Sequence, residues 1–296
     1  MRFLILWLCA LTMASCQYID SVVLFGDSIT QAWSDGSLAQ RMSEYYLRRL
    51  DVVNRGFGGY NTDNALSAFE SVWATRAERE AGCAQPARLI TIWFGANDAV
   101  VEGGWQHVPL DRFRANLETL VERVRSPHSK WYSPQTRVVL VSCPPVVTAD
   151  RHAAQMAKWR EFGSKGAAPW PDRDPATTKK YAMATVELGK TLGVPVLDVY
   201  HGICEAAGSE KQEDLARFLY DGLHLNSEGY AVVFEGLKRL ILREWPEMDP
   251  ESLPMPMPYW ADIDKADPEA SFKTALAEAR AYEGKVGKDE RKREEL

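Results

Sequence analysis

Short runs of β-branched and other apolar residues alternate along the chain with longer segments of helical periodicity, and this alternation restricts the fold more than any other feature. The apolar runs lie at 21–25, 52–54, 89–94, 138–142 and 194–199, and the helical segments at 38–50, 62–80, 110–125, 176–192 and 227–243. Parallel strands need crossover connections, and helices then bury both faces of the sheet. We therefore predict an α/β protein, a three-layer α/β/α sandwich with a mainly parallel five-stranded sheet.

The amino terminus has the three parts of a secretory signal. Arg2 precedes an apolar run at 3–13, and small residues follow at 14–16. The run is too short to cross a bilayer, which needs about 20 apolar residues, so we expect no stable membrane insertion. We predict that 1–16 is a cleavable signal peptide and that the protein is secreted. The alternative is a hydrophobic extension that packs on the body of a cytoplasmic protein; it stays open because the sequence has no Asn-x-Ser/Thr acceptor.

The rest of the chain is predicted to form one domain over 17–264 with a charged tail. Residues 150–175 mix charges, tryptophans, glycines and prolines, which predicts an irregular insertion with one short helix at most, a surface loop more than a lid. Residues 265–296 hold equal numbers of acidic and basic side chains and few apolar ones. This pattern predicts a solvated helix or a disordered tail without a catalytic role.

Charge and cysteine content exclude several classes of function. The formal net charge is −6, and no basic stripe is present, so a nucleic acid is not an expected partner. Removing 1–16 leaves Cys83, Cys143 and Cys204, an odd number without CxxC spacing, and HExxH is absent. We predict neither a disulfide framework nor a metal site, and expect a small-molecule substrate. The sequence leaves the oligomeric state open.

Polar clusters follow three of the predicted strands, and a fourth precedes the last long helix. They lie at 26–30, 54–61, 95–98 and 221–226. In an open parallel sheet, ligands bind outside the carboxyl ends of the strands. We therefore expect the four clusters to meet at one edge of the sheet.

Nucleophilic catalysis needs a hydroxyl, a base and a group that orients the base. Ser28 lies at a strand-to-helix turn, where an exposed Oγ and free backbone N–H groups coincide. Two of the five histidines follow an aspartate by three residues, His201 after Asp198 and His224 after Asp221. Asp198 falls inside an expected strand, whereas Asp221 and His224 share a loop containing glycine that can fold the carboxylate onto Nδ1. We favour His224 and keep His201 as the alternative.

A tetrahedral oxyanion also requires donors that are already in place. Gly59 lets its N–H approach a substrate closely, and the Asn97 amide can donate beside the Ser28 N–H. Each motif alone is common in ordinary turns, but the four together favour catalysis. A small-anion binding module is the non-enzymatic alternative; it is disfavoured because GxGxxG and GxxxxGK[ST] are absent and a binder needs no Asp–His pair.

These motifs resemble the SGNH or GDSL hydrolases, which combine a Gly-Asp-Ser nucleophile, a donor glycine, Gly-x-Asn-Asp and an Asp-x-x-His pair. Segments at 25–30, 54–57, 60–62, 221–224 and 258–264 are similar to the isoamyl acetate-hydrolysing esterase branch, and the resemblance spans 20–264. It implies a flavodoxin-like hydrolase fold and no metal or organic cofactor. The residue roles that it implies are nucleophile Ser28, base His224 with its partner Asp221, and oxyanion donors Ser28, Gly59 and Asn97.

The expected activity is hydrolysis of carboxylic esters, with short- to medium-chain acyl groups, through an acyl-enzyme on Ser28. Acyl transfer to an alcohol would use the same triad and remains an alternative. Two positions depart from the family pattern. Gly58 stands where many relatives have serine, which leaves Gly58 beside Gly59 as a candidate donor, and Asp63 stands where the branch often has a basic residue.

Overall fold

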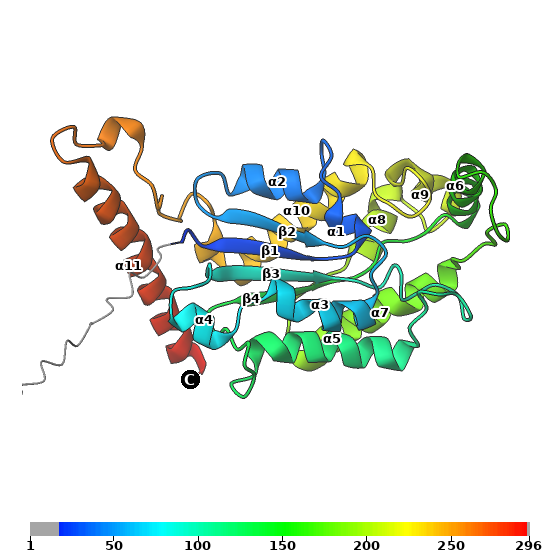
Figure 1. Ribbon diagram of the computed structural model, residues 1–296, viewed down its shortest axis with the longest axis horizontal. Coiled ribbons are helices and arrows are strands. Elements are labelled where there is room, and N and C mark those ends of the chain that lie inside the picture. Colours follow the sequence, from blue (N-terminus) through cyan, green and yellow to red (C-terminus); the bar gives the residue numbers. More distant parts are fainter. Residues whose placement is uncertain (1–17, 295–296) are drawn as a thin grey trace, which may run out of the picture.

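Five parallel strands form the centre of the molecule (Figure 1). The computed structural model describes residues 18–294, without the side chains at 280 and from 283 onward, so the predicted signal peptide lies outside the described residues. The strand order is β2-β1-β3-β4-β5. The strands are β1 (Ser21–Gly26), β2 (Asp51–Gly56), β3 (Ala87–Trp93), β4 (Arg137–Val141) and β5 (Val196–Leu197).

Two layers of helices cover the sheet, which confirms the predicted α/β/α sandwich. In Figure 1, α2, α8 and α10 lie on one face and α3, α5 and α7 on the other. The helices are α1 (Ser28–Gln31), α2 (Leu38–Tyr45), α3 (Thr62–Val72), α4 (Arg76–Glu80), α5 (Leu110–Arg125), α6 (Thr148–Glu161), α7 (Pro175–Leu192), α8 (Val199–Ala207), α9 (Gln212–Leu215), α10 (Ser227–Glu244) and α11 (Pro268–Glu294). Short 3-10 helices follow at η1 (Ala216–Phe218), η2 (Pro246–Met248) and η3 (Trp260–Asp262).

The pairing register brings the carboxyl ends of the central strands to one edge of the sheet. Gly26 at the end of β1 pairs with Gly56 on β2 and with Trp93 on β3. Every residue of β1 and β3 is buried, as expected for strands covered on both faces. The loops that follow these strands therefore start from a rigid, close-packed base.

Some boundaries differ from the predicted ones. The helical segment expected at 62–80 is two helices, because Trp73 is extended and Thr75 caps a new helix. The last strand is only two residues long. Asp198 was predicted to lie inside a strand, and this prediction is wrong. It is the N-cap of α8, and its carboxylate accepts from the His201 N–H at 3.2 Å.

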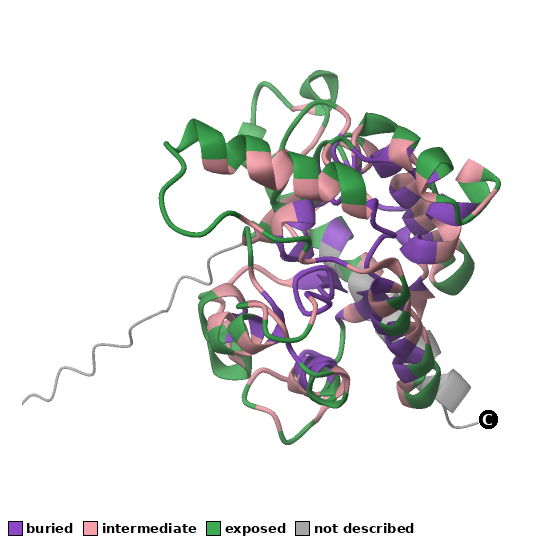
Figure 2. Ribbon diagram, turned by 90° about the vertical axis from the view of Figure 1, so that its right-hand side faces the viewer, coloured by how far each residue is buried: buried purple, intermediate pink, exposed green. Residues whose placement is uncertain are grey.

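The segment 150–175 was expected to be irregular, and this prediction is wrong for its first part. Residues Thr148–Glu161 form α6, a helix of 14 residues with no buried residue. Figure 2 looks onto this end of the molecule and shows exposed and half-buried residues along α6. A helix without a buried face has no clear apolar stripe, so periodicity could not reveal it.

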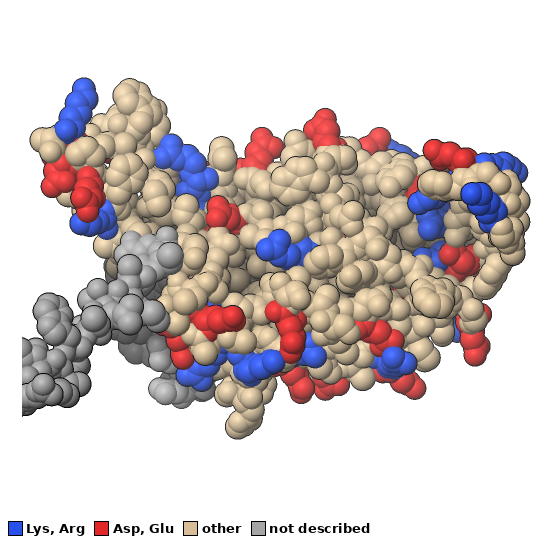
Figure 3. All heavy atoms as spheres, in the orientation of Figure 1, with Lys and Arg blue, Asp and Glu red and all other residues tan. Residues whose placement is uncertain are grey.

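The charged tail is helical. It forms α11, which lies by the amino ends of the strands in Figure 1, where Ala279 is buried and the Tyr282 hydroxyl donates to the Glu247 carbonyl at 3.1 Å. On the face in Figure 3, acidic and basic side chains of the described residues are interspersed. Between residues 18 and 294, none of the helices combines the length and apolar character needed to span a membrane.

Candidate active site

The turn after β1 presents Ser28 at the carboxyl edge of the sheet. Asp27 caps the first turn of α1, since its Oδ1 accepts from the Ile29 N–H at 2.8 Å. Gly26 is needed because a Cβ there would lie 2.6 Å from the Trp93 carbonyl oxygen. Ser28 is half-buried, and its N–H has no hydrogen-bond acceptor within the described part of the chain. A hydroxyl and a free N–H thus occupy the same turn.

The structure brings Ser28, His224 and Asp221 together although 196 positions separate Ser28 from His224. Ser28 Oγ lies 2.8 Å from His224 Nε2, and His224 Nδ1 lies 2.7 Å from Asp221 Oδ2. The other oxygen of Asp221 accepts from the backbone N–H groups of Leu223 at 3.1 Å and of His224 at 2.8 Å. This turn holds the imidazole with Nδ1 toward the carboxylate and Nε2 toward the hydroxyl.

The carboxyl of Asp221 has a lowered pKa. Burial alone raises the pKa of its carboxyl, but hydrogen bonds from the His224 side chain and backbone outweigh burial and lower the pKa to about 2. Arg151 of α6 adds a contact, with Nη1 3.1 Å from Asp221 Oδ2. A negative charge at this position faces Nδ1 of His224, which keeps its hydrogen on that side of the ring and leaves Nε2 for the Ser28 hydroxyl.

Gly222 fits the Asp221–His224 turn against the start of α6. Its φ is +76°, and an added Cβ would lie 2.3 Å from the Val147 carbonyl oxygen and 2.4 Å from the Arg151 nitrogen. The Val147 N–H also donates to the Gly222 carbonyl at 2.8 Å. The predicted turn therefore needs glycine for two reasons, backbone conformation and close approach.

The alternative pair is also formed, but away from Ser28. His201 Nδ1 lies 2.6 Å from Asp198 Oδ2, and the Ser142 hydroxyl donates to Asp198 Oδ1 at 3.1 Å. Both residues line a hollow of about 460 Å³ between β5, α8 and α10, and Ser28 does not line it. Only His224 of the two histidines contacts the Ser28 hydroxyl.

Asn97 and Gly59 flank the turn that carries Ser28. Asn97 is 4% exposed, and its Nδ2 donates one hydrogen to the Tyr60 carbonyl at 2.9 Å, which leaves the second N–H for another acceptor. Gly59 has a φ of +82°, and within the described part of the chain its N–H has no acceptor. The Gly58 N–H is already used, because it donates to Gln31 Oε1. Gly59 is thus the glycine with a free donor.

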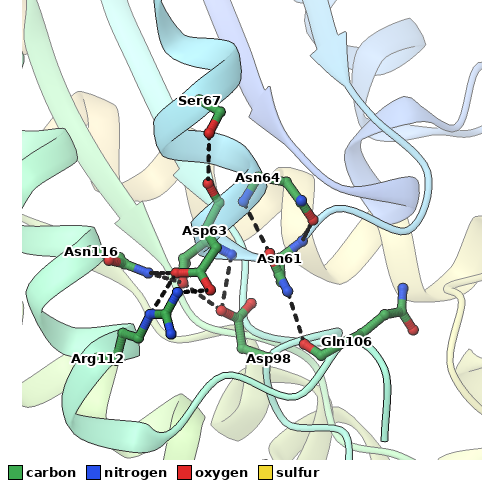
Figure 4. Close-up of polar contacts among 9 residues, drawn as sticks. Asn61, Asp63, Asn64, Ser67, Asp98, Gln106, Arg112 and Asn116 are labelled. Carbon is green, nitrogen blue, oxygen red and sulfur yellow. Dashed lines mark hydrogen bonds and ion pairs between the residues drawn. The ribbon is translucent and has the colours of Figure 1, made fainter.

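Hydrogen bonds, buried at Asp98 and more exposed at Gln106, join the loop after β2 to the loop after β3 (Figure 4). Asp98 Oδ1 accepts from the Thr62 N–H at 2.9 Å and from the Thr62 hydroxyl at 2.5 Å. Asn61 Nδ2 donates to the Gln106 carbonyl at 3.0 Å, and Gln106 Nε2 donates to the Gly59 carbonyl at 2.7 Å. These contacts fix the position of the loop that carries Gly59 relative to the loop that carries Asn97.

Asp63, the departure from the branch pattern, forms an ion pair in the same region. Its carboxylate lies 2.6 Å from Arg112 Nη2 and accepts from Asn116 Nδ2 at 2.8 Å (Figure 4). The acidic side chain is therefore balanced by a neighbouring base.

Two buried carboxyl groups next to the site have raised pKa values. Burial raises the pKa of Asp27 to about 7, against the opposing hydrogen bond from the Ile29 N–H. Burial also raises the pKa of Asp98 to about 6, against the hydrogen bonds from Thr62. A charge on Asp98 also opposes ionisation of Asp27. Asp27 therefore loses its proton only near pH 7, and Asp98 loses its proton near pH 6.

Sequence reasoning missed three residues that contact the predicted ones. Arg151 contacts Asp221, Arg173 donates to Asn97 Oδ1 at 3.1 Å, and the Tyr220 ring stacks on His224 with centroids 5.6 Å apart. Both arginines come from the segment that was expected to be a surface loop. Their charges were visible in the sequence, but no local pattern indicates which buried group a distant arginine reaches.

A metal site is not evident in the described residues. No group of three or more histidine, cysteine, aspartate or glutamate side chains between 18 and 294 could hold an ion. Within that range Cys83 is exposed and free, and Cys143 and Cys204 are buried and free.

Comparison with known proteins gives the family. Residues 24–232 match the family model of the GDSL-like lipase/acylhydrolase family. A GDSL esterase/lipase of Arabidopsis thaliana is 34% identical over 255 residues, covering 85% of this chain and 96% of that protein. The isoamyl acetate-hydrolyzing esterase 1 homolog of Bos taurus is 33% identical over 271 residues, covering 88% and 98%.

A solved structure agrees in fold. The lipase/acylhydrolase from Enterococcus faecalis superposes with a TM-score of 0.53 at 24% identity, over 76% of this chain and 96% of that one. The region matched by the family model contains strands β2 to β5, the second half of β1 and the four polar clusters. The chain therefore belongs to the GDSL-like lipase/acylhydrolase family and is a carboxylic ester hydrolase.

Proposed function

We propose that the protein hydrolyses carboxylic esters in two steps through an acyl-enzyme on Ser28. The observation that carries this proposal is the chain of contacts from Ser28 Oγ to His224 Nε2 at 2.8 Å and from His224 Nδ1 to Asp221 Oδ2 at 2.7 Å. A hydroxyl, a base and an orienting carboxylate in this order are what nucleophilic acyl transfer needs.

In the first step the Ser28 oxygen attacks the ester carbonyl carbon while its proton passes to His224 Nε2. The carbonyl oxygen becomes an oxyanion, which accepts hydrogen bonds from the Ser28 N–H, the Gly59 N–H and the second N–H of Asn97 Nδ2. The ionised Asp221 stabilises the imidazolium. The carbon–oxygen bond to the alcohol then breaks, and His224 gives its proton to the leaving alkoxide.

In the second step water takes the place of the alcohol. His224 accepts a proton from water, whose oxygen attacks the acyl carbon, and the same three donors stabilise the second oxyanion. The intermediate then collapses, and His224 returns the proton to Ser28 as the carboxylic acid leaves. One base thus serves both halves of the reaction.

We infer that the substrates are small esters with short- to medium-chain acyl groups. This inference is supported by the relatives, several of which are named for hydrolysis of isoamyl acetate, an ester of a two-carbon acid and a branched alcohol. Half-burial of Ser28 and the exposed Tyr220 ring beside His224 are compatible with an open site for such esters.

The proposal is tested with nitrophenyl esters of increasing acyl length on the wild type and on Ser28→Ala. We expect activity to be greatest with short acyl chains and to be abolished by the substitution. The acyl-enzyme is tested by quenching with acid during turnover and measuring the mass of the Ser28 peptide. Full activity in Ser28→Ala would overturn the mechanism.

The same assay separates hydrolysis from acyl transfer. With isoamyl alcohol added, a hydrolase releases the free acid as the main product, whereas an acyltransferase forms isoamyl ester at its expense. We expect free acid. The matched control for Ser28→Ala is Ser34→Ala, at an exposed serine in the loop after α1, and we expect it to keep wild-type turnover.

A further inference from the structure

Arg173 is a buried arginine whose guanidinium donates hydrogen bonds to the loop after β3. The residue is only 2% exposed. Its Nη2 donates to Asn97 Oδ1 at 3.1 Å, and its Nε donates to the Ala96 carbonyl at 3.0 Å. Its Nη1 lies 2.7 Å from Asp172 Oδ2, which balances the charge. The fork of donors therefore holds both the side chain of Asn97 and the backbone just before it.

This contact fixes the oxygen side of the Asn97 amide, while the Tyr60 carbonyl accepts from its nitrogen side. An asparagine amide can turn by 180° and exchange its oxygen and nitrogen with almost no change in shape. A turned Asn97 would direct an acceptor, not a donor, at an oxyanion. Because a guanidinium can only donate, a turned amide would set its Nδ2 against the N–H of Arg173 and leave both donors unpaired in a buried place.

The backbone around Arg173 is itself held against the β3 loop. Val101 N–H donates to the Asp172 carbonyl at 3.1 Å, and Arg173 forms an isolated antiparallel bridge with Val100. The Thr148 hydroxyl donates to the Arg173 carbonyl at 3.1 Å, which joins the two ends of the segment that contains α6. The guanidinium therefore starts from a fixed backbone and has little freedom to leave Asn97.

We infer that Arg173 is the positioning residue of the oxyanion hole. It keeps Nδ2 of Asn97 directed at the reacting carbonyl, and its positive charge on Oδ1 strengthens the amide as a donor. This inference rests on the proposed function, in which Asn97 is one of three oxyanion donors. The segment 148–173 then contributes to the chemistry from a distance, through Arg173, and does not contact the substrate at that position.

A donor that acts only on the oxyanion lowers the barrier without changing substrate binding. The expected effect of Arg173→Met is therefore a loss of kcat by about tenfold to a hundredfold, below the 10²–10³-fold typical for loss of a whole donor. KM should stay within about threefold. A purely structural arginine would instead lower the amount of folded enzyme, which active-site titration measures and corrects.

The decisive experiment is a double-mutant cycle with Asn97→Ala. If Arg173 acts through the Asn97 amide, Arg173→Met lowers kcat in the wild type but changes it by less than about twofold when Asn97 is already alanine. An equal fractional loss in both backgrounds would overturn the inference and leave the proposed function standing. Wild-type kcat in Asn97→Ala would overturn the assignment of the donor itself, and the inference with it.

Two further variants keep the cycle interpretable. Arg88→Met removes another buried arginine, which pairs with Asp20 at 2.7 Å at the amino end of β3, and should leave kcat per folded enzyme within about twofold. If Arg173→Met does not fold, the double-mutant cycle is run with Arg173→Lys. Lysine retains the positive charge but lacks the planar set of N–H donors of the guanidinium. The loss of kcat in this variant is expected to be smaller and again absent with alanine at 97.

Discussion

The carboxylate of Asp221 lies 2.7 Å from Nδ1 of His224, and this contact directs Nε2 of the same ring to the Ser28 hydroxyl at 2.8 Å. The Asp198–His201 pair has the same spacing and a contact of 2.6 Å, yet between residues 18 and 294 no serine hydroxyl forms a hydrogen bond with its Nε2. Two motifs with the same spacing therefore differ in whether the fold places a serine hydroxyl beside the histidine.

The first prediction compares the two histidines directly. His224→Ala should lower kcat by about 10³-fold or more, because it removes the base for both steps, whereas His201→Ala should stay within about threefold. Turnover of a short-chain nitrophenyl ester measures both. A large loss in His201→Ala with an active His224→Ala would assign the base to His201.

The second prediction concerns Gly222. Gly193 has a positive φ of +59° with no atom near a would-be Cβ, so Gly193→Ala should cost only about 1 kcal/mol of unfolding free energy. Gly222→Ala adds a collision with backbone atoms of Val147 and Arg151 and should cost about 2 kcal/mol more. Urea denaturation of the two variants isolates the collision. Equal costs would contradict the tight packing of α6 on the turn.

The third prediction is a pH dependence of stability from Asp27. Its pKa is raised to about 7 in the folded protein, mainly by burial. The folded state therefore holds a proton that the unfolded chain releases near pH 4, and stability falls as pH rises from about 4 through 7. Asp27→Asn stays neutral and can still accept from the Ile29 N–H.

We expect Asp27→Asn to unfold with the same midpoint as the wild type at pH 4 and to be more stable at pH 8, by up to a few kcal/mol in order of magnitude. Thermal unfolding at the two pH values measures this difference. Asp35→Asn, at an exposed aspartate, is the control and should show no such divergence. If the unfolding midpoints of the wild type and of Asp27→Asn changed by the same amount between pH 4 and pH 8, the raised pKa of Asp27 would be contradicted.

The fourth prediction tests the contact between the loops after β2 and β3. The Thr62 hydroxyl donates to Asp98 and accepts from Asn116 Nδ2 at 3.0 Å. Thr62→Val should cost about 1–3 kcal/mol, because both buried partners lose a hydrogen bond, and should lower kcat as Gly59 and Asn97 lose their set separation. Thr119→Val, whose hydroxyl bonds within α5 at the surface, should cost less than about 0.5 kcal/mol.

Much of the site could be predicted because its parts are local motifs. Asp27 shapes the turn of Ser28 locally, because it accepts from the Ile29 N–H two positions further on. Asp221 and His224 form their pair inside one turn. By contrast, the choice between Gly58 and Gly59 depended on Gln31, 27 positions before Gly58, which occupies the Gly58 N–H.

The segment 150–175 could not be interpreted from sequence. An exposed helix such as α6 has no buried stripe for periodicity to detect. The roles of Arg151 and Arg173 depend on contacts across 70 and 76 positions, which no pattern within the segment records. A stretch that looked like a surface loop thus supplies two arginines to the residues of the candidate site.

The sequence by itself determined the parallel sheet and the residue types at its carboxyl edge, because burial of apolar runs and the geometry of short turns are local properties. The tertiary structure alone decided which histidine meets Ser28, which glycine keeps a free N–H and what fixes the Asn97 amide. Each of these depends on atoms brought together by chain crossovers, and their physical cause is the mutual packing of elements that are far apart in the sequence.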